Sequence, residues 1–115
     1  MNDDTLAHLH DILESGRAVK RFVGEGTFEE YGADDQLRSA VERKFEIMGE
    51  ALNRMRRDAP HVLQRIDHHR DIISFRNILV HGYDAIDDRI VWGVIQDDLD
   101  GLLDQVQSLL DRDTV

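Results

Sequence analysis

Cysteine is absent from this 115-residue sequence, and proline and tryptophan occur once each. Without thiols, neither a disulfide framework nor a thiolate zinc site can form. The unbroken apolar runs are only a few residues long, whereas a membrane-spanning helix needs about 20. The acidic start Met1-Asn2-Asp3-Asp4 is unlike a signal peptide, and the sequence has no glycine-rich phosphate loop. We therefore expect a cytoplasmic protein that makes no contact with a membrane.

The charge is strongly negative and unevenly distributed. The formal net charge is −10, with −6 in residues 1–53, −7 in residues 82–115 and +3 in residues 54–81. A negative net charge disfavours non-specific binding to nucleic acid, but the basic centre could still offer a path for phosphate groups. Its candidate RNA-binding residues are Arg54, Arg57 and Arg70. The alternative is that these arginines are only solvated helix ends.

Apolar residues recur at helical spacing, and the alternation typical of strands is absent. Pro60 interrupts the helical pattern, and residues 25–35 are predicted to be a polar connection. The spacing predicts an all-α, antiparallel bundle of four to five helices that forms one domain over residues 1–115. The expected helices run from an Asn2 or Asp3 cap to Gly24, along the stripe Leu37–Met55, over 70–81, and onwards from a cap at Asp87 or Asp88, with a helical fragment within 61–69.

The most informative stretch is the segment 76–83, which reads R-N-I-L-V-H-G-Y. Placing Arg76 and His81 among apolar residues is costly unless they have partners or line a cleft. Arginine binds phosphate through paired hydrogen bonds, and histidine transfers protons near neutral pH. On a helix these two residues are about 140° and about 7.5 Å apart. That geometry favours a groove, or a site completed by a second copy of the chain, over a closed pocket.

These residue types suit RNA cleavage, which needs no cofactor. A base removes the proton of a 2′-hydroxyl, a cation stabilises charge on the phosphate, and an acid protonates the leaving oxygen. Each residue alone has a simpler interpretation: His81 could end a helix, Arg76 could pair with an acid, and Tyr83 could pack at the helix end. No metal site is expected, because the adjacent His68 and His69 would point about 100° apart on a helix.

At these residues the chain resembles the HepT-like branch of the HEPN superfamily, over nearly its whole length. The motif R-N-x-x-V-H-G-Y in an all-helical chain of this size is the most specific part of the resemblance. The pair His68-His69 stands where family members often carry Pro-Trp. The other matching segments are Phe28-Glu29-Glu30-Tyr31, Ile47-Met48-Gly49-Glu50-Ala51, Asp71-Ile72-Ile73, Ile90-Val91-Trp92 and Asp97-Asp98-Leu99.

The resemblance implies a homodimeric, metal-independent endoribonuclease that acts as the toxin of a type II toxin–antitoxin system. Arg76 and His81 would be its catalytic pair, and Asn77 a supporting polar residue. It also implies a minimal nucleotidyltransferase antitoxin that neutralises the toxin by forming a complex or by attaching AMP to Tyr83. An added phosphate would bring negative charge and bulk to the cleft.

Two other functions fit the same sequence. The chain could be a non-catalytic helical module that binds a nucleotidyltransferase and presents substrate to it, which the net charge of −10 favours. It could also be a plain helical dimerisation protein, which leaves the cluster of Arg76, Asn77 and His81 unexplained.

Overall fold

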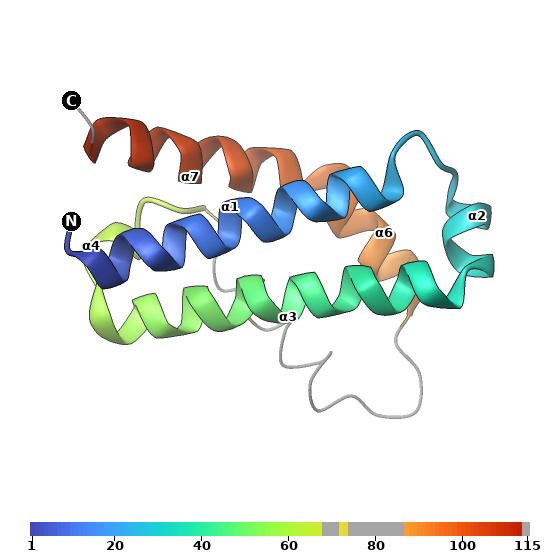
Figure 1. The fold of residues 1–115 in the computed structure, drawn as a ribbon, viewed down its shortest axis with the longest axis horizontal. Coiled ribbons are helices and arrows are strands. Elements are labelled where there is room, and N and C mark those ends of the chain that lie inside the picture. The colour runs from blue at the N-terminus through green and yellow to red at the C-terminus, as the bar shows by residue number, and fades with distance from the viewer. Residues whose placement is uncertain (68–71, 74–86, 114–115) are drawn as a thin grey trace.

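The computed structural model describes residues 1–67, 72–73 and 87–113. Within these residues the chain forms helices and no strand. The second-longest helix, α1, lies between α3 and α7 and packs against both (Figure 1). The all-α class expected from the sequence is confirmed. The helices are α1 (Asp3–Val23), α2 (Phe28–Ala33), α3 (Asp35–Asp58), α4 (Pro60–Leu63), α6 (Asp88–Asp97) and α7 (Leu99–Asp113).

The predicted boundaries of the first helix are confirmed by its caps. Asn2 is the N-cap of α1, and its side-chain oxygen accepts a hydrogen bond of 2.8 Å from the backbone N–H of Thr5. The helix ends at Gly24, where φ is +54° and the backbone N–H donates to the carbonyl of Lys20. Glycine suits this position because a Cβ is strained at positive φ.

The long second predicted helix is α3, which begins after Asp34. The Asp34 carboxylate accepts a 3.0 Å hydrogen bond from the N–H of Leu37. Asp58 is the last residue of α3, and Pro60 then becomes the first residue of the short α4, where proline is tolerated because its missing N–H has no intrahelical partner. The break expected at Pro60 is therefore confirmed, and α4 overlaps only the start of the region 61–69 in which a helical fragment is predicted.

Two predictions about the connections were wrong. The polar connection at 25–35 contains α2, which begins with a capping box: Thr27 Oγ1 accepts from the N–H of Glu30, and a Glu30 carboxylate oxygen accepts from the N–H of Thr27. The final helix is two helices, α6 and α7, separated at Asp98. The separation lets α6 contact α2 while α7 contacts α1.

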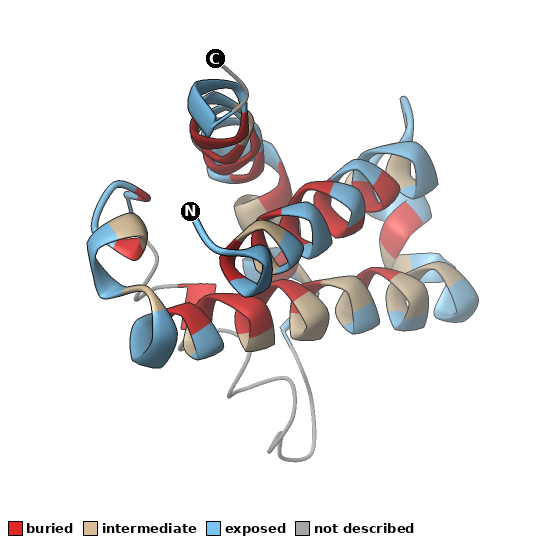
Figure 2. Ribbon diagram, turned by 60° about the vertical axis from the view of Figure 1, so that its left-hand side comes forward, coloured by how far each residue is buried: buried red, intermediate tan, exposed pale blue. Residues whose placement is uncertain are grey.

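The predicted helix over 70–81 falls mostly outside the described residues. Ile72 and Ile73 are described, and both are buried. They belong to the same hydrophobic core as the stripes of α1, α3 and α7. Figure 2 shows that the buried residues of the long helices face the interior of the bundle.

The apolar stripe of α3 supplies the centre of the core. Val41, Phe45, Met48, Leu52 and Met55 are fully buried, at the spacing of one helix face. Each such side chain contributes about 1.5–3 kcal/mol to stability through burial alone. In the described part of the chain, no helix is both long enough and apolar enough to cross a bilayer.

Candidate functional site

Five predicted site residues, Arg70, Arg76, Asn77, His81 and Tyr83, lie outside the described residues. The structure describes what borders them in the sequence. On the N-terminal side stand Ile72 and Ile73, which are 3% and 5% exposed. On the C-terminal side stands Asp87, the N-cap of α6, whose carboxylate accepts a 2.9 Å hydrogen bond from the N–H of Arg89. The motif at 76–83 is thus flanked by a pair of core residues and a capped helix start.

A reciprocal pair of hydrogen bonds holds the chain after α4 against α7. The backbone N–H of Asp67 donates to Gln105 Oε1 at 2.9 Å, and Gln105 Nε2 donates to Asp67 Oδ2 at 2.9 Å. Leu63 and Ile66, just before Asp67, are buried in the core. We refer to the pair Asp67 and Gln105 as the clamp. It fixes the backbone that leads towards the predicted motif.

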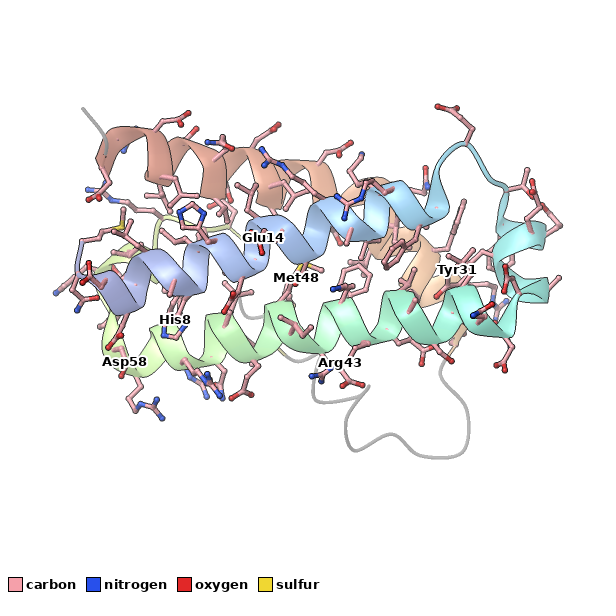
Figure 3. All side chains as sticks on the ribbon, viewed as in Figure 1. His8, Glu14, Tyr31, Arg43, Met48 and Asp58 are labelled. Atoms are coloured by element: carbon pink, nitrogen blue, oxygen red, sulfur yellow. The ribbon has the colours of Figure 1, made fainter. Side chains whose placement is uncertain are left out.

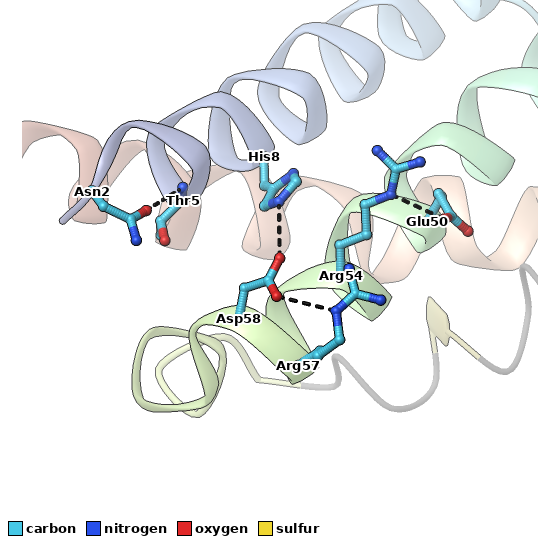
Figure 4. A network of polar contacts seen from close by, with 7 residues as sticks. All are labelled: Asn2, Thr5, His8, Glu50, Arg54, Arg57 and Asp58. Atoms are coloured by element: carbon cyan, nitrogen blue, oxygen red, sulfur yellow. Dashed lines mark hydrogen bonds and ion pairs between the residues drawn. The ribbon is translucent and has the colours of Figure 1, made fainter.

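The structure places Arg54 and Arg57 on the exposed surface of α3, both in ion pairs. Arg54 Nε lies 3.1 Å from a carboxylate oxygen of Glu50, one turn earlier, and Arg57 Nε lies 3.1 Å from Asp58 Oδ1 (Figure 4). The other oxygen of Asp58 lies 3.8 Å from His8 Nε2 on α1. The two predicted RNA-binding arginines that the structure describes, Arg54 and Arg57, therefore both already have an anionic neighbour.

Two adjoining hollows lie between α4 and α7 and share Arg65, Leu109 and Arg112 in their walls. The first has a volume of about 330 Å³ and is also lined by His61 and Val62. The second, of about 480 Å³, is lined further by Asp104, Gln105 and Ser108. We refer to the two together as the α4–α7 groove. Both α4 and the last turns of α7, which line it, lie at the same end of the bundle (Figure 1).

A third hollow, of about 260 Å³, is acidic, unlike the α4–α7 groove. It lies beside Ile72 and is lined by the carboxylates of Asp67, Asp97 and Asp98. Three carboxylates without an arginine or lysine in the lining repel phosphate groups. The α4–α7 groove, by contrast, has Arg65 and Arg112 in its walls.

Of the described residues, the polar side chain with the least exposure, Tyr31, lies away from these surfaces, at the α2 end of the bundle (Figure 3). Tyr31 is 1% exposed, and its ring centroid lies 5.6 Å from that of Trp92. Its hydroxyl is buried without a hydrogen-bond partner in the described part of the chain. Burial, reinforced by the carboxylates of Glu42 and Asp88, raises the pKa of Tyr31 far above its usual range.

Glu42 shares this environment. Its pKa is raised, first by burial and then by the charge of Asp88, while Arg38 acts in the opposite direction. The residues that the structure describes include no group of three or more histidines and carboxylates arranged to hold a metal ion. We see this region as structural, because the aromatic rings of Phe28, Tyr31 and Trp92 fill it.

Sequence reasoning missed the convergence of Arg65 and Arg112. Arg65 is one of six arginines in the basic centre at residues 54–81, and Arg112 belongs to the acidic C-terminal third. The two are 47 residues apart, so only the tertiary fold brings the segment after α4 and the end of α7 to one groove. No local spacing signals such a pair.

The fold defines the chain as a small all-α helical-bundle protein. Comparison with known proteins then gives the family: the model of the HepT-like ribonucleases matches residues 12–109, and the chain belongs to this family. The chain is 31% identical, over 90% of its length and 94% of the relative, to "Putative RNase MJ1380" of Methanocaldococcus jannaschii. It is 29% identical to "Probable ribonuclease HepT" of Thermococcus cleftensis, over 89% of this chain and 92% of the relative. No solved structure matches.

Proposed function

We propose that this chain is a metal-independent endoribonuclease and the toxin of a type II toxin–antitoxin system. It acts in the cytoplasm as a homodimer, with residues 1–115 forming one domain. The observation that carries the proposal is that the family match over residues 12–109 contains the motif R-N-x-x-V-H-G-Y at 76–83. The relatives that match over nine-tenths of their length are named as ribonucleases.

The proposed reaction uses side chains alone. His81 of one copy removes the proton of a ribose 2′-hydroxyl, and the 2′ oxygen bonds to phosphorus. Arg76 binds the phosphate oxygens and stabilises the charge that grows on them. The bond from phosphorus to the 5′ oxygen breaks, and a protonated histidine of the dimer gives that oxygen its proton. Asn77 supports the site as a hydrogen-bonding group.

Arg54, Arg57 and Arg70 are proposed RNA contacts. For the two that the structure describes, a phosphate has to replace an existing carboxylate: that of Glu50 beside Arg54 and that of Asp58 beside Arg57. Both pairs are exposed, and exposed ion pairs contribute only about 0–1 kcal/mol. Replacing these carboxylates by a phosphate therefore costs little free energy. Arg54 and Arg57 nevertheless gain no clear preference for phosphate over other exposed arginines.

The experiment that tests the cleavage mechanism compares purified wild type with His81→Ala on single-stranded RNA in the presence of EDTA. We expect cleavage by wild type and loss of at least a hundredfold in rate for His81→Ala, since general acid–base catalysis contributes about 10²–10⁴-fold. His10→Ala is the matched control, because His10 is an exposed histidine on α1. Cleavage that EDTA abolishes, or that survives in His81→Ala, contradicts the mechanism.

The proposed regulation involves a minimal nucleotidyltransferase that transfers AMP from ATP to the hydroxyl of Tyr83 and releases pyrophosphate. The intact mass of the chain, measured after co-expression with the transferase, should increase by whole AMP units. The increase should disappear in Tyr83→Phe and persist in Tyr31→Phe, because Tyr31 is buried. An unchanged mass with a tight complex would indicate neutralisation by binding alone.

The alternative function is a non-catalytic module that binds a nucleotidyltransferase and presents substrate to it. The net charge of −10 favours it, because a negative chain repels RNA. Tight binding to the transferase, together with no RNA cleavage by the dimer, would support this alternative. Growth arrest that wild type causes and His81→Ala does not would support the toxin.

A further inference from the structure

The α4–α7 groove contains two arginines, Arg65 and Arg112, whose guanidinium groups have no partner in the described part of the chain. Neither the Arg65 side chain nor the Arg112 side chain has a hydrogen-bond or ion-pair partner within residues 1–67, 72–73 and 87–113. Most other described arginines have such a partner. The partnered ones are Arg17 with Gln107, Arg38 with Asp35, Arg43 with Glu46, Arg54 with Glu50, Arg56 with Asn53, Arg57 with Asp58 and Arg89 with Asp87.

Two other unpartnered cations of the described chain, Arg21 and Lys44, line a different hollow between α1 and α3. That hollow is also lined by Arg17, whose side chain donates to Gln107, and by the carboxylates of Asp11 and Glu14. In the α4–α7 groove the carboxylates are Asp104 and Asp113. Asp113 Oδ1 lies 2.9 Å from the amino-terminal nitrogen of Met1, and this ion pair partly neutralises the negative charge of Asp113.

The backbone beneath the two arginines is well fixed. Arg65 lies between the buried side chains of Leu63 and Ile66, and the clamp secures Asp67 two residues later. Arg112 extends from the last turn of α7, next to the buried Leu109. A site on fixed backbone loses less conformational entropy when a ligand binds.

We propose that the α4–α7 groove binds the phosphodiester backbone of single-stranded RNA, with Arg65 and Arg112 each contacting a phosphate. This inference rests on the proposed ribonuclease function and adds a substrate contact to it. Guanidinium groups without a carboxylate partner are ready for the paired hydrogen bonds that phosphate accepts. His61 adds a further donor, and Val62 and Leu109 offer an apolar wall for a ribose or base.

The open, elongated shape of the α4–α7 groove favours a strand of RNA over a small phosphate compound as its ligand. The two hollows adjoin through Arg65, Leu109 and Arg112, which gives an open path with a cation at its middle. The hollow beside Ile72 is acidic and turns a polyanion away from that side. The path thus directs an RNA strand along α4 and α7.

The test measures binding of a fluorescent, single-stranded 2′-O-methyl RNA, which lacks the attacking hydroxyl, by anisotropy at several salt concentrations. We compare wild type with Arg65→Gln/Arg112→Gln and with the control Arg43→Gln/Arg89→Gln, which removes the same charge elsewhere. Loss of two phosphate contacts should reduce the slope of log K against log salt by about 1.4, because each contact to a single strand contributes about 0.7. The control should keep the wild-type slope.

Asp104→Asn provides a second variant whose expected effect is a gain. Removing this carboxylate from the groove should tighten RNA binding, a change that partial unfolding cannot imitate. Equal slopes for the groove variant and the control, together with unchanged binding by Asp104→Asn, would overturn the proposal. RNA cleavage by wild type is measured separately, so the ribonuclease function can stand while the groove proposal fails.

An acidic protein surface is the competing occupant. If the groove variant binds RNA as wild type does but loses affinity for the nucleotidyltransferase, the groove is a protein-docking surface and the RNA proposal is wrong.

Discussion

Gly16 on α1 lies directly against Leu103 on α7, with no space for a side chain between them. A Cβ at position 16 would collide with Leu103 Cδ2 and would lie only 3.1 Å from its Cγ. Gly16 and Leu103 are both buried. The absence of a side chain at residue 16 therefore sets how closely α1 approaches α7.

Gly16→Ala should destabilise the protein although alanine is the better helix former. Overpacking a buried contact costs about 1–3 kcal/mol, which exceeds the gain of about 0.5–1 kcal/mol from replacing a helical glycine. The free energy of unfolding, measured with urea, should fall. Gly101→Ala on α7 is the control: nothing lies within 4 Å of its Cβ position, and it should raise stability. Stabilisation by both changes would contradict the close contact.

Tyr31→Phe should leave stability unchanged or increase it. The hydroxyl of Tyr31 is buried without a partner in the described chain, and a buried group in that state costs about 1–3 kcal/mol. The ring contacts with Trp92 remain in phenylalanine. Thermal unfolding measures the change, and Tyr31→Ala should lose about 3–5 kcal/mol as a large-to-small substitution in the core. A clear loss of stability in Tyr31→Phe would show that the hydroxyl has an essential partner.

Glu42→Gln should stabilise the protein at neutral pH and lose that advantage in acid. The pKa of Glu42 is raised in the folded state, so the folded protein binds this proton more tightly than the unfolded chain does. Stability therefore falls as pH rises from the ordinary glutamate pKa of about 4.3 through the raised value. The difference in unfolding midpoint between variant and wild type should be present at pH 7 and vanish below about pH 4.

The control for that experiment is Glu25→Gln, in the exposed connection before α2. Its midpoint should follow that of wild type across the same pH range. A Glu42→Gln difference that stays constant with pH would contradict the assigned cause.

Gln105→Ala should loosen the chain that leads to the predicted motif. It removes both hydrogen bonds of the clamp, and each is worth about 0.5–1.5 kcal/mol. Amide hydrogen exchange should show faster exchange at Asp67, and Ser108→Ala on the same helix should not. If cleavage by the Gln105→Ala variant also slows, the clamp positions the segment that carries His81.

The helices were predictable because their signals are local. Asn2, Gly24 and Pro60 mark helix ends through their own backbone and side-chain chemistry, and the structure confirms all three. The capping box of Thr27 and Glu30 was equally legible in the sequence, but the short length and polarity of the segment favoured a loop. The break at Asp98 had no such signal, because the apolar stripe continues across it.

The candidate site likewise has one part that local sequence predicts and one part that only the tertiary structure reveals. The motif at 76–83 can be read from adjacent residues, and it stays a prediction because it lies outside the described residues. The α4–α7 groove depends on Arg65 meeting Arg112 through tertiary packing. Periodicity gives the face of a helix, but it does not say which distant residue lies opposite.

The break at Asp98 makes the register of two helices depend on one residue. Inserting a residue there would turn α7 by about 100° relative to α6. The leucines of α7 would leave α1, while Trp92 on α6 kept its place beside Tyr31. A family member with a longer or shorter joint would therefore need a new set of contacts on α1, so chain length at this joint should be far more constrained than side-chain identity.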